Sequence, residues 1–320
     1  MKTIHNWLKD VFRKLLKKTG VVTNRDLLKS IDAANQNAER LEGILRHVEW
    51  VVANDRLVSA EIFSGNTIFY GDAIKILERN GSNILRHNRE IKLITDHKIA
   101  VESNDHIFPE STLEGLVRHP RLAKKAKEIF GDKMSFLDIG CGAGALVFDF
   151  AFEGILSIGI DGSDTCLKAH NNYWRVLPDN FFTCDITKKF SLTDSAEKTK
   201  QFELITSWEV LEHIPEAGLS QMLKNIHDHL ADGGYFIGTA SLLEYSNPKT
   251  EVVYHVTLQN KEWWSNLFGE NGLQIIESGH PFSFNDFYRG VGNRYQDLHS
   301  YMDNPQAGFQ FVAKKLIKQK

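Results

Sequence analysis

The stretch LDIGCGAGAL, residues 137–146, decides the fold, because an apolar run leads directly into closely spaced glycines. Glycines at the end of a buried strand let the backbone turn tightly and approach a ligand closely. Gly140, Gly142 and Gly144, with Ala145 in the last place, also fit the dinucleotide-binding pattern GxGxxG/A, although that pattern alone is weak. The stretch therefore predicts a ligand-binding turn between a strand and a helix, and its neighbours must identify the ligand.

Strand-like and helix-like segments alternate from about residue 116 to the end of the chain. This order predicts an α/β fold in which a doubly wound, mostly parallel sheet carries helices on both faces. The seven expected strands are MSFLDIG, LSIGIDG, NFFTCDI, FELITSW and GYFIGTA, followed late in the chain by LQIIESG and GFQFVAKK.

Composition excludes several classes of protein. The 320 residues are 42% hydrophobic with a net charge of −3, so a sizeable core is possible and the basic excess of a nucleic-acid-binding protein is absent. The three cysteines form no CxxC pair, and no apolar run approaches the ~18 residues of a membrane span. The start of the chain shows no secretory signal, so a cytoplasmic protein is expected.

The first 53 residues are expected to form two helices. Residues 1–20 are amphipathic and rich in lysine, which suits a helix on the inner membrane face, or a helix packed on the protein itself. Residues 21–53 keep an unbroken heptad seam and predict a coiled coil through which the chain forms a homo-oligomer, or a helix packed on the body of the same chain. Residues 54–115 form a connecting region without an assigned fold, and residues 116–320 form the α/β domain.

Three aspartates lie at the ends of successive expected strands. Asp138 precedes the first glycine, where a carboxylate disfavours a pyrophosphate and favours a cationic ligand. Asp161 can accept hydrogen bonds from ribose hydroxyls, and Asp185 from the exocyclic amine of adenine. S-adenosylmethionine offers all three partners. Each aspartate alone is equally well explained as a helix cap, but three in register favour the ligand.

The chain resembles the class I S-adenosylmethionine-dependent methyltransferases, which have a Rossmann-like fold, through LDIGCGAG, GIDGS, CDI and WEVLEHI in this order and spacing. The resemblance covers roughly residues 116–320, and GFQFVAKK fits the reversed seventh strand of that fold. It implies that Asp138, Gly140 and Gly142 line the methionine end of the cofactor. It also implies that Asp161 holds the ribose, and Asp185 with Ile186 the adenine. Further cofactor contacts are expected at Cys141, Gly144, Gly162, Ser163, Ser207 and Trp208.

The stretch WEVLEHI, residues 208–214, follows the fourth strand and carries Glu209, Glu212 and His213. On a helix these three side chains share one face, beside the strand end that borders the ligand in doubly wound sheets. Three interpretations stay open. The acids solvate the start of a helix capped by Ser207, His213 is a general base for an acceptor hydroxyl, or all three side chains bind a divalent metal.

The Glu-x-x-Glu-His pattern is similar to that of ubiquinone-pathway O-methyltransferases and of small-RNA 2′-O-methyltransferases, in which a downstream histidine completes a metal site. This resemblance implies a metal site formed by Glu209, Glu212, His213 and His255. Two carboxylates and two imidazoles suit Mn²⁺, Fe²⁺ or Zn²⁺ better than Mg²⁺. Such a site also favours oxygen as the acceptor atom, because a nitrogen acceptor would need less help.

The acceptor is expected to be a sugar or surface-glycan intermediate, because WEVLEHI together with HVTLQNKEWW resembles methyltransferases of bacterial surface-polysaccharide genes. A lipid quinone and a small RNA are the alternatives, and RNA is disfavoured because no dense basic patch accompanies the domain. An S-adenosylmethionine-binding scaffold without turnover and an NAD-linked oxidoreductase are alternatives of other classes. Acceptor contacts are expected in SNDHIFPE, in HVTLQNKEWW and in the aromatic insert, residues 281–307.

Overall fold

The structure is a computed structural model that describes residues 85–109, 118–169, 172–287, 289, 301 and 304–316. The membrane-surface helix expected at residues 1–20 and the coiled coil expected at residues 21–53 lie outside the described residues. Within the described part, no helix combines the length and apolar character that a membrane span requires.

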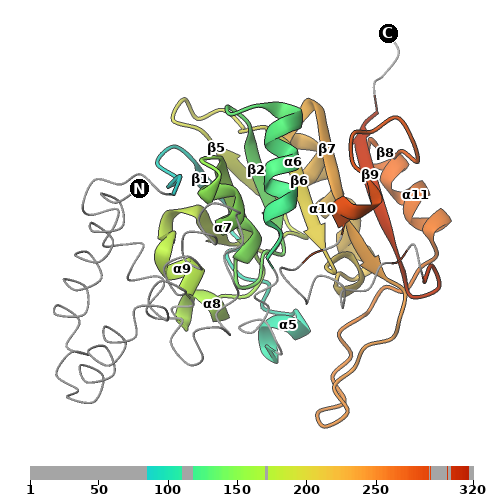
Figure 1. The fold of residues 1–320 in the computed structure, drawn as a ribbon. Coiled ribbons are helices and arrows are strands. Elements are labelled where there is room, and N and C mark those ends of the chain that lie inside the picture. The colour runs from blue at the N-terminus through green and yellow to red at the C-terminus, as the bar shows by residue number, and fades with distance from the viewer. Residues whose placement is uncertain are drawn as a thin grey trace, which may run out of the picture. The chain divides into compact units, whose positions relative to one another are not determined.

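A seven-stranded sheet with the order β4-β3-β2-β6-β7-β9-β8 forms the centre of the domain (Figure 1). All neighbouring strands are parallel except that β9 runs antiparallel to β7 and β8. The expected doubly wound, mostly parallel sheet with a reversed last strand is therefore confirmed. The strands are β2 (Ser135–Ile139), β3 (Leu156–Asp161), β4 (Phe181–Thr183), β6 (Phe202–Trp208), β7 (Leu230–Ser241), β8 (Leu273–Ile275) and β9 (Gly308–Lys315).

Helices cover both faces of this sheet. The described helices are α6 (Pro120–Phe130), α7 (Ala145–Phe152), α8 (Thr165–Lys168), α9 (Asn172–Val176), α10 (Glu216–His229) and α11 (Lys261–Glu270). Figure 1 shows α6 and α7 in front of the central strands and α11 beside β8. Short 3₁₀ turns are η2 (Pro178–Asn180), η3 (Leu211–His213) and η4 (Phe284–Phe287).

Alternation along β2 explains how the two faces are filled, because successive side chains of a strand point to opposite faces. Phe136 stacks on Phe150 of α7 with ring centroids 3.6 Å apart. Leu137 belongs instead to the cluster that includes Leu223 of α10 and Trp264 of α11. Trp264 is fully buried and anchors the core, so it does not form a sugar platform.

Residues 85–109, left without a fold by the sequence, pack against the sheet. They contribute β1 (Lys92–Ile94), which pairs antiparallel with β5 (Ser191–Thr193), and the short helix α5 (Asn104–Ile107). We call residues 97–108 the strap. The amide of Ala100 donates to the carbonyl of Gly162 at 2.9 Å. The strap therefore contacts the loop that follows β3, although the domain was expected to begin only at residue 116.

Candidate active site

The glycine turn between β2 and α7 has the geometry that its sequence predicts. Gly140, Gly142 and Gly144 have φ angles of +74°, +49° and +86°, in the left-handed region that favours glycine. A Cβ on Gly140 would collide with the side chain of Val210, and one on Gly144 with the ring of Phe181. Neighbouring side chains therefore pack directly against the backbone of the turn, which lies at the carboxyl edge of the sheet.

Asp138 lies within this edge and is only 4% exposed. Its carboxylate accepts a hydrogen bond from the Thr206 hydroxyl at 2.6 Å. Burial raises the pKa of Asp138 to about 7, a rise that the Thr206 hydrogen bond and the charge of Arg289 limit. A carboxylate that is costly to ionise in the free protein is suited to a cationic ligand, which would favour its charged form.

Asp161, the last residue of β3, uses both carboxylate oxygens. One accepts from the amide of Gly142 at 2.7 Å and the other from the amide of Ser163 at 2.8 Å. Burial raises the pKa of Asp161 as well. Asp161 thus joins the glycine turn to Ser163 in the loop that follows.

The other expected cofactor residues line the same edge. Asp185 follows β4 and accepts from the amide and the hydroxyl of Thr187 through one oxygen, which is also the geometry of its alternative role as a cap. Ile186 and Cys141 are buried. Ser207 and Trp208 end β6, and their Oγ and Nε1 atoms are buried without a hydrogen-bond partner among the described residues. Unpaired buried donors are costly, so these two fit a site that a polar ligand fills.

The WEVLEHI stretch is not the regular α-helix that its spacing predicts. Glu209 has a φ of +56°, and only Leu211–His213 form a single 3₁₀ turn, η3. Ser207 is still part of β6 and does not cap η3, because the N-cap residue of η3 is Val210. The sharp turn brings Val210 against Gly140, so tertiary packing rather than helix propensity sets this backbone.

Glu209 is not grouped with the other three expected ligands. Its carboxylate accepts a hydrogen bond from the hydroxyl of Tyr301 at 2.5 Å. The group of side chains whose ligand atoms all lie within 4.8 Å of one another contains Glu212, His213 and His255, without Glu209. The structure therefore groups three of the four expected ligands.

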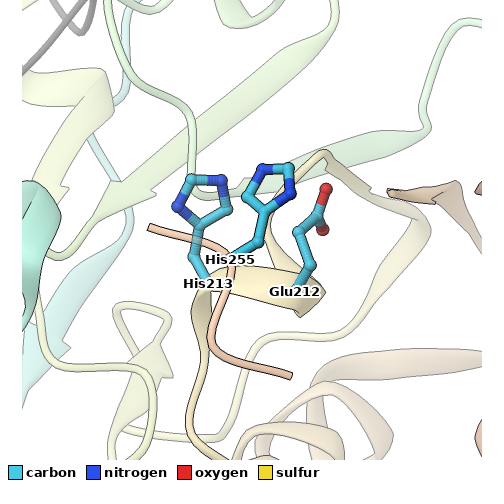
Figure 2. Close-up of side chains that lie close together, drawn as sticks. All are labelled: Glu212, His213 and His255. Atoms are coloured by element: carbon cyan, nitrogen blue, oxygen red, sulfur yellow. The ribbon is translucent and has the colours of Figure 1, made fainter. Parts of the chain in front are cut away.

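These three side chains form a compact cluster, which we call the EHH cluster. Figure 2 shows them side by side and pointing in the same direction. Glu212 and His213 come from η3, whereas His255 comes from the loop between β7 and α11. Val256 and Thr257 donate their amides to the carbonyl of Glu212, which fixes this loop against η3.

Each imidazole of the EHH cluster is held through Nδ1. The Nδ1 of His213 lies 3.0 Å from a carboxylate oxygen of Asp105, and the Nδ1 of His255 lies 2.6 Å from the carbonyl oxygen of Leu243. Because both partners accept, each Nδ1 donates, and the lone pair of the neutral ring is on Nε2. Metal-binding histidines are held in this way by carboxylates and carbonyls.

Glu212 supplies the carboxyl group of the EHH cluster from a fully buried position. One oxygen accepts from the amide of Ser241 at 2.9 Å, and the other has no hydrogen-bond partner among the described residues. Burial, followed by the charge of Glu209, raises the pKa of Glu212 to about 8. This unpaired oxygen and two imidazole nitrogens fit a divalent cation.

The charges around His213 oppose its burial. Burial acts to lower the pKa of His213, but the carboxylates of Asp105, Glu212 and Glu209 together raise the pKa above its ordinary value. The pKa of His255 is lowered, chiefly by burial. The two rings lie 4.8 Å apart in an edge-to-face arrangement. The cluster therefore holds one imidazole that retains a proton more readily than the other.

Sequence reasoning missed two residues of this site. Asp105 lies 108 residues before His213, and Tyr301 lies 92 residues after Glu209. Asp105 falls in SNDHIFPE, which the sequence indicates only as a segment of acceptor contacts. No periodicity or motif spacing relates positions so far apart.

Comparison with known proteins identifies the family. A family described as a methyltransferase domain matches residues 110–285, which is more than half of the chain. The chain is 36% identical over 121 residues to a ubiquinone biosynthesis O-methyltransferase of Glaesserella parasuis serovar 5, covering 36% of this chain and 48% of that protein. It is 27% identical over 165 residues to a protein of the same name from Coxiella burnetii, covering 51% of this chain and 64% of that protein.

These relatives are matched over only part of their length. The chain spans about half of the first and less than two thirds of the second. Among solved structures, a TehB-like S-adenosylmethionine-dependent methyltransferase from Corynebacterium glutamicum has a TM-score of 0.41 at 16% identity, covering 61% of this chain and 86% of that one.

Proposed function

The chain belongs to the S-adenosylmethionine-dependent methyltransferases, and on this basis we propose that it methylates an oxygen atom of its acceptor. The observation that carries this proposal is the EHH cluster, which follows β6 at the sheet edge that also holds Asp138 and Asp161. Methyl donor and acceptor would then meet at one edge of the sheet. The methyl group passes from sulfur to oxygen, the sulfur–carbon bond breaks, and the acceptor hydroxyl releases a proton.

The protein's part in this reaction is alignment and control of the acceptor proton. The glycine turn and the aspartates bind and orient the donor, because in-line placement of the reacting atoms lowers the barrier. Glu212, His213 and His255 would hold a divalent cation with positions left open for acceptor oxygens. A cation bound there lowers the pKa of the acceptor hydroxyl. Two imidazoles and one carboxylate favour Mn²⁺, Fe²⁺ or Zn²⁺ over Mg²⁺.

A metal-free mechanism is the second candidate, and one observation favours it. The hydrogen bond from His213 to Asp105 leaves a lone pair on Nε2, as in a general base held by a carboxylate. In that case Nε2 takes the acceptor proton while the methyl group is transferred. The two mechanisms use the same imidazole nitrogen, so they exclude each other.

We propose a lipid-tailed aromatic hydroxyl, as in a quinone precursor, as the acceptor in place of the sugar first expected. The names of the relatives support this choice. The surface beside the imidazoles supports it as well, because apolar side chains there are at least 42% exposed. They belong to the strap and to the loop that carries His255, namely Ile107, Phe108, Leu243, Tyr245, Val253 and Val256.

Calorimetric titration of metal-stripped protein with S-adenosylhomocysteine, with and without Mn²⁺, tests the mechanism. A separate metal isotherm that is lost in Glu212→Gln and in His255→Ala would support the metal mechanism. Binding of the nucleoside without a metal isotherm would favour His213 as a base. Absence of nucleoside binding would contradict the roles of Asp138 and Asp161.

Turnover measurements test the acceptor. We expect methylation of a catechol that carries a short prenyl chain, measured as S-adenosylhomocysteine release, and slower turnover of the same catechol without the chain. A nucleotide sugar and a short RNA duplex are the comparison substrates. Faster methylation of the nucleotide sugar than of the prenylated catechol would restore the glycan acceptor.

A further inference from the structure

Asp105 contacts a central residue of the site from outside the segment that the family matches. Its two carboxylate oxygens lie 3.1 and 3.0 Å from Nδ1 of His213. The family match begins at residue 110, whereas Asp105 lies in α5 of the strap. The contact is therefore a feature of this chain beyond the matched domain.

The strap is fixed next to Asp105, so the contact is built into the fold. The Ser103 hydroxyl caps α5 by accepting from the amide of Asp105. Asn104 donates its side-chain amide to the carbonyl of Val253 at 2.7 Å. The hydroxyl of Tyr254 donates to the carbonyl of Phe108 at 2.7 Å. Residues on both sides of Asp105 thus hold the loop that carries His255.

The N-terminal end of the strap is hydrogen-bonded to residues that are expected to contact the cofactor. The carbonyl of His97 accepts from the amide of Asp185 at 2.9 Å, and the amide of Ala100 donates to Gly162 at 2.9 Å. Within α5, the imidazole of His106 lies 3.4 Å from the hydroxyl of Ser163. One segment therefore connects the expected adenine and ribose contacts with both imidazoles of the EHH cluster.

We propose that Asp105 is a positioning residue for His213, which holds Nδ1 protonated and the ring in place so that Nε2 presents its lone pair to the site. The inference rests on the proposed function, since the lone pair serves either a bound cation or the acceptor proton. A carboxylate behind a metal-binding imidazole fixes its tautomer and raises its basicity, and losing such a partner typically costs about 10- to 100-fold in metal affinity.

If Asp105 only stabilised the fold, its substitution would lower the melting temperature. The side chain of Asp105 is 37% exposed, and exposed ion pairs contribute little to folding. Asp105→Asn should therefore leave the melting temperature nearly unchanged while it weakens the site. Asn keeps the size of the side chain and removes the charge. Glu102→Gln, an exposed acid on the same strap, is the matched control for loss of one negative charge.

The first measurement is Mn²⁺ titration of the metal-stripped full chain by calorimetry. We expect Asp105→Asn to weaken Mn²⁺ binding by about 10- to 100-fold and Glu102→Gln to leave it unchanged, with S-adenosylhomocysteine affinity retained in both. Unchanged Mn²⁺ affinity in Asp105→Asn would overturn the inference. Absence of Mn²⁺ binding by the unsubstituted protein would instead count against the proposed metal mechanism.

The second measurement decides the role of Asp105 whether or not a metal binds. Nitrogen-15 NMR of histidine-labelled, metal-stripped protein at alkaline pH reports the tautomer of each neutral imidazole, and His213→Gln identifies the relevant signal. We expect the Nδ1–H tautomer for His213 in the unsubstituted protein and in Glu102→Gln, and a tautomer mixture in Asp105→Asn. The same tautomer in all three proteins would overturn the inference.

Discussion

Asp138 is buried, and the described residues around it only partly offset the free-energy cost of ionising its carboxyl group. Its pKa rises from the ordinary 3.8 to about 7 on folding, so the folded state binds a proton between these values that the unfolded state has lost. Stability from this residue therefore falls as pH rises from about 4 through 7 and is lowest above pH 7. A cationic ligand reverses this cost, which is why the residue suits a sulfonium cofactor.

We predict that Asp138→Asn stabilises the ligand-free protein above pH 7 by about 2 kcal/mol, because Asn retains an acceptor for Thr206 without the buried charge. Denaturant unfolding between pH 4 and 8 measures the change, and the variant should show a flatter profile. Its affinity for S-adenosylhomocysteine should fall by about tenfold, as expected for a lost charged hydrogen bond.

The control for Asp138→Asn is Asp132→Asn, since the side chain of Asp132 is 86% exposed. It should change neither the pH profile nor the nucleoside affinity. A less stable Asp138→Asn variant at pH 8 would show that the charge of Asp138 is compensated in the folded protein.

Glu212 gives the second prediction at this scale. Its unpaired buried oxygen is the only carboxyl ligand atom of the EHH cluster, so Glu212→Gln should abolish Mn²⁺ binding to the limit of calorimetry. Binding of S-adenosylhomocysteine should persist, because the residues that surround the expected cofactor site are unchanged. Glu270→Gln, at the exposed end of α11, should retain both isotherms. Retention of the metal isotherm in Glu212→Gln would remove Glu212 from the site.

At the scale of elements, η3 shows where sequence patterns stop being informative. The i, i+3, i+4 spacing of Glu209, Glu212 and His213 predicts a helix face, yet Glu209 adopts a left-handed φ of +56°. Glutamate has no intrinsic preference for that region, so the conformation is imposed by packing. The contact between Val210 and Gly140 is part of that packing, and it joins two loops that only the folded sheet brings together.

The positions of the seven strands, in contrast, could be predicted, and two of them to their ends. GFQFVAKK corresponds to β9, Gly308–Lys315, and FELITSW to β6, Phe202–Trp208. In a doubly wound fold, a long apolar run bounded by glycine or charged residues is best explained as a buried strand of the sheet. Residues 85–109 have no such run, and their short elements are stabilised by distant partners, so their fold was not predictable from local sequence.

Gly140 provides the prediction at this scale. Gly140→Ala combines an unfavourable φ of +74° with a collision against Val210, so we expect a loss of about 2–3 kcal/mol in the free energy of unfolding. The same change should displace η3 and weaken S-adenosylhomocysteine binding by more than about tenfold, since small displacements are costly in a prearranged site. Chemical denaturation and calorimetry measure the two effects.

Gly154→Ala is the matched control for Gly140→Ala. Gly154 has a similar φ of +80°, but a Cβ there meets nothing within 4 Å. It should lose only the backbone term of about 1 kcal/mol, with nucleoside affinity unchanged. Equal effects of the two substitutions would mean that the contact with Val210 is unimportant.

At the scale of the whole molecule, the site includes pairs of residues that lie too far apart in the sequence for a motif to relate them. The acids at the carboxyl ends of β2, β3 and β4 were predictable as a set, because carboxyl ends of neighbouring parallel strands meet at one edge. The pairs Asp105–His213 and Tyr301–Glu209 were not, because their members lie 108 and 92 residues apart. The tertiary fold alone brings them together.

The GxGxxG/A pattern of the turn fits both a sulfonium nucleoside and a dinucleotide, so the pattern alone does not identify the ligand. Residues around the turn in the folded molecule distinguish the two. Asp138 is buried and Asp161 is partly buried at the turn, where a pyrophosphate would meet two carboxylates. Ligands that bind only the folded state stabilise it by about 2.7 kcal/mol at a concentration of 100 times Kd. The melting temperature measured with each ligand therefore distinguishes the two, and the measurement needs no acceptor substrate.

We predict that saturating S-adenosylhomocysteine raises the melting temperature of the full chain by about 5–10 °C, from that free energy and the usual 2–4 °C per kcal/mol. NAD⁺ at the same concentration should leave it unchanged, because its pyrophosphate is repelled at Asp138. Differential scanning fluorimetry measures both, with adenosine as the control for the nucleoside moiety alone. Stabilisation by NAD⁺ but not by S-adenosylhomocysteine would contradict the cofactor assignment and favour an oxidoreductase, since the glycine turn itself permits either ligand.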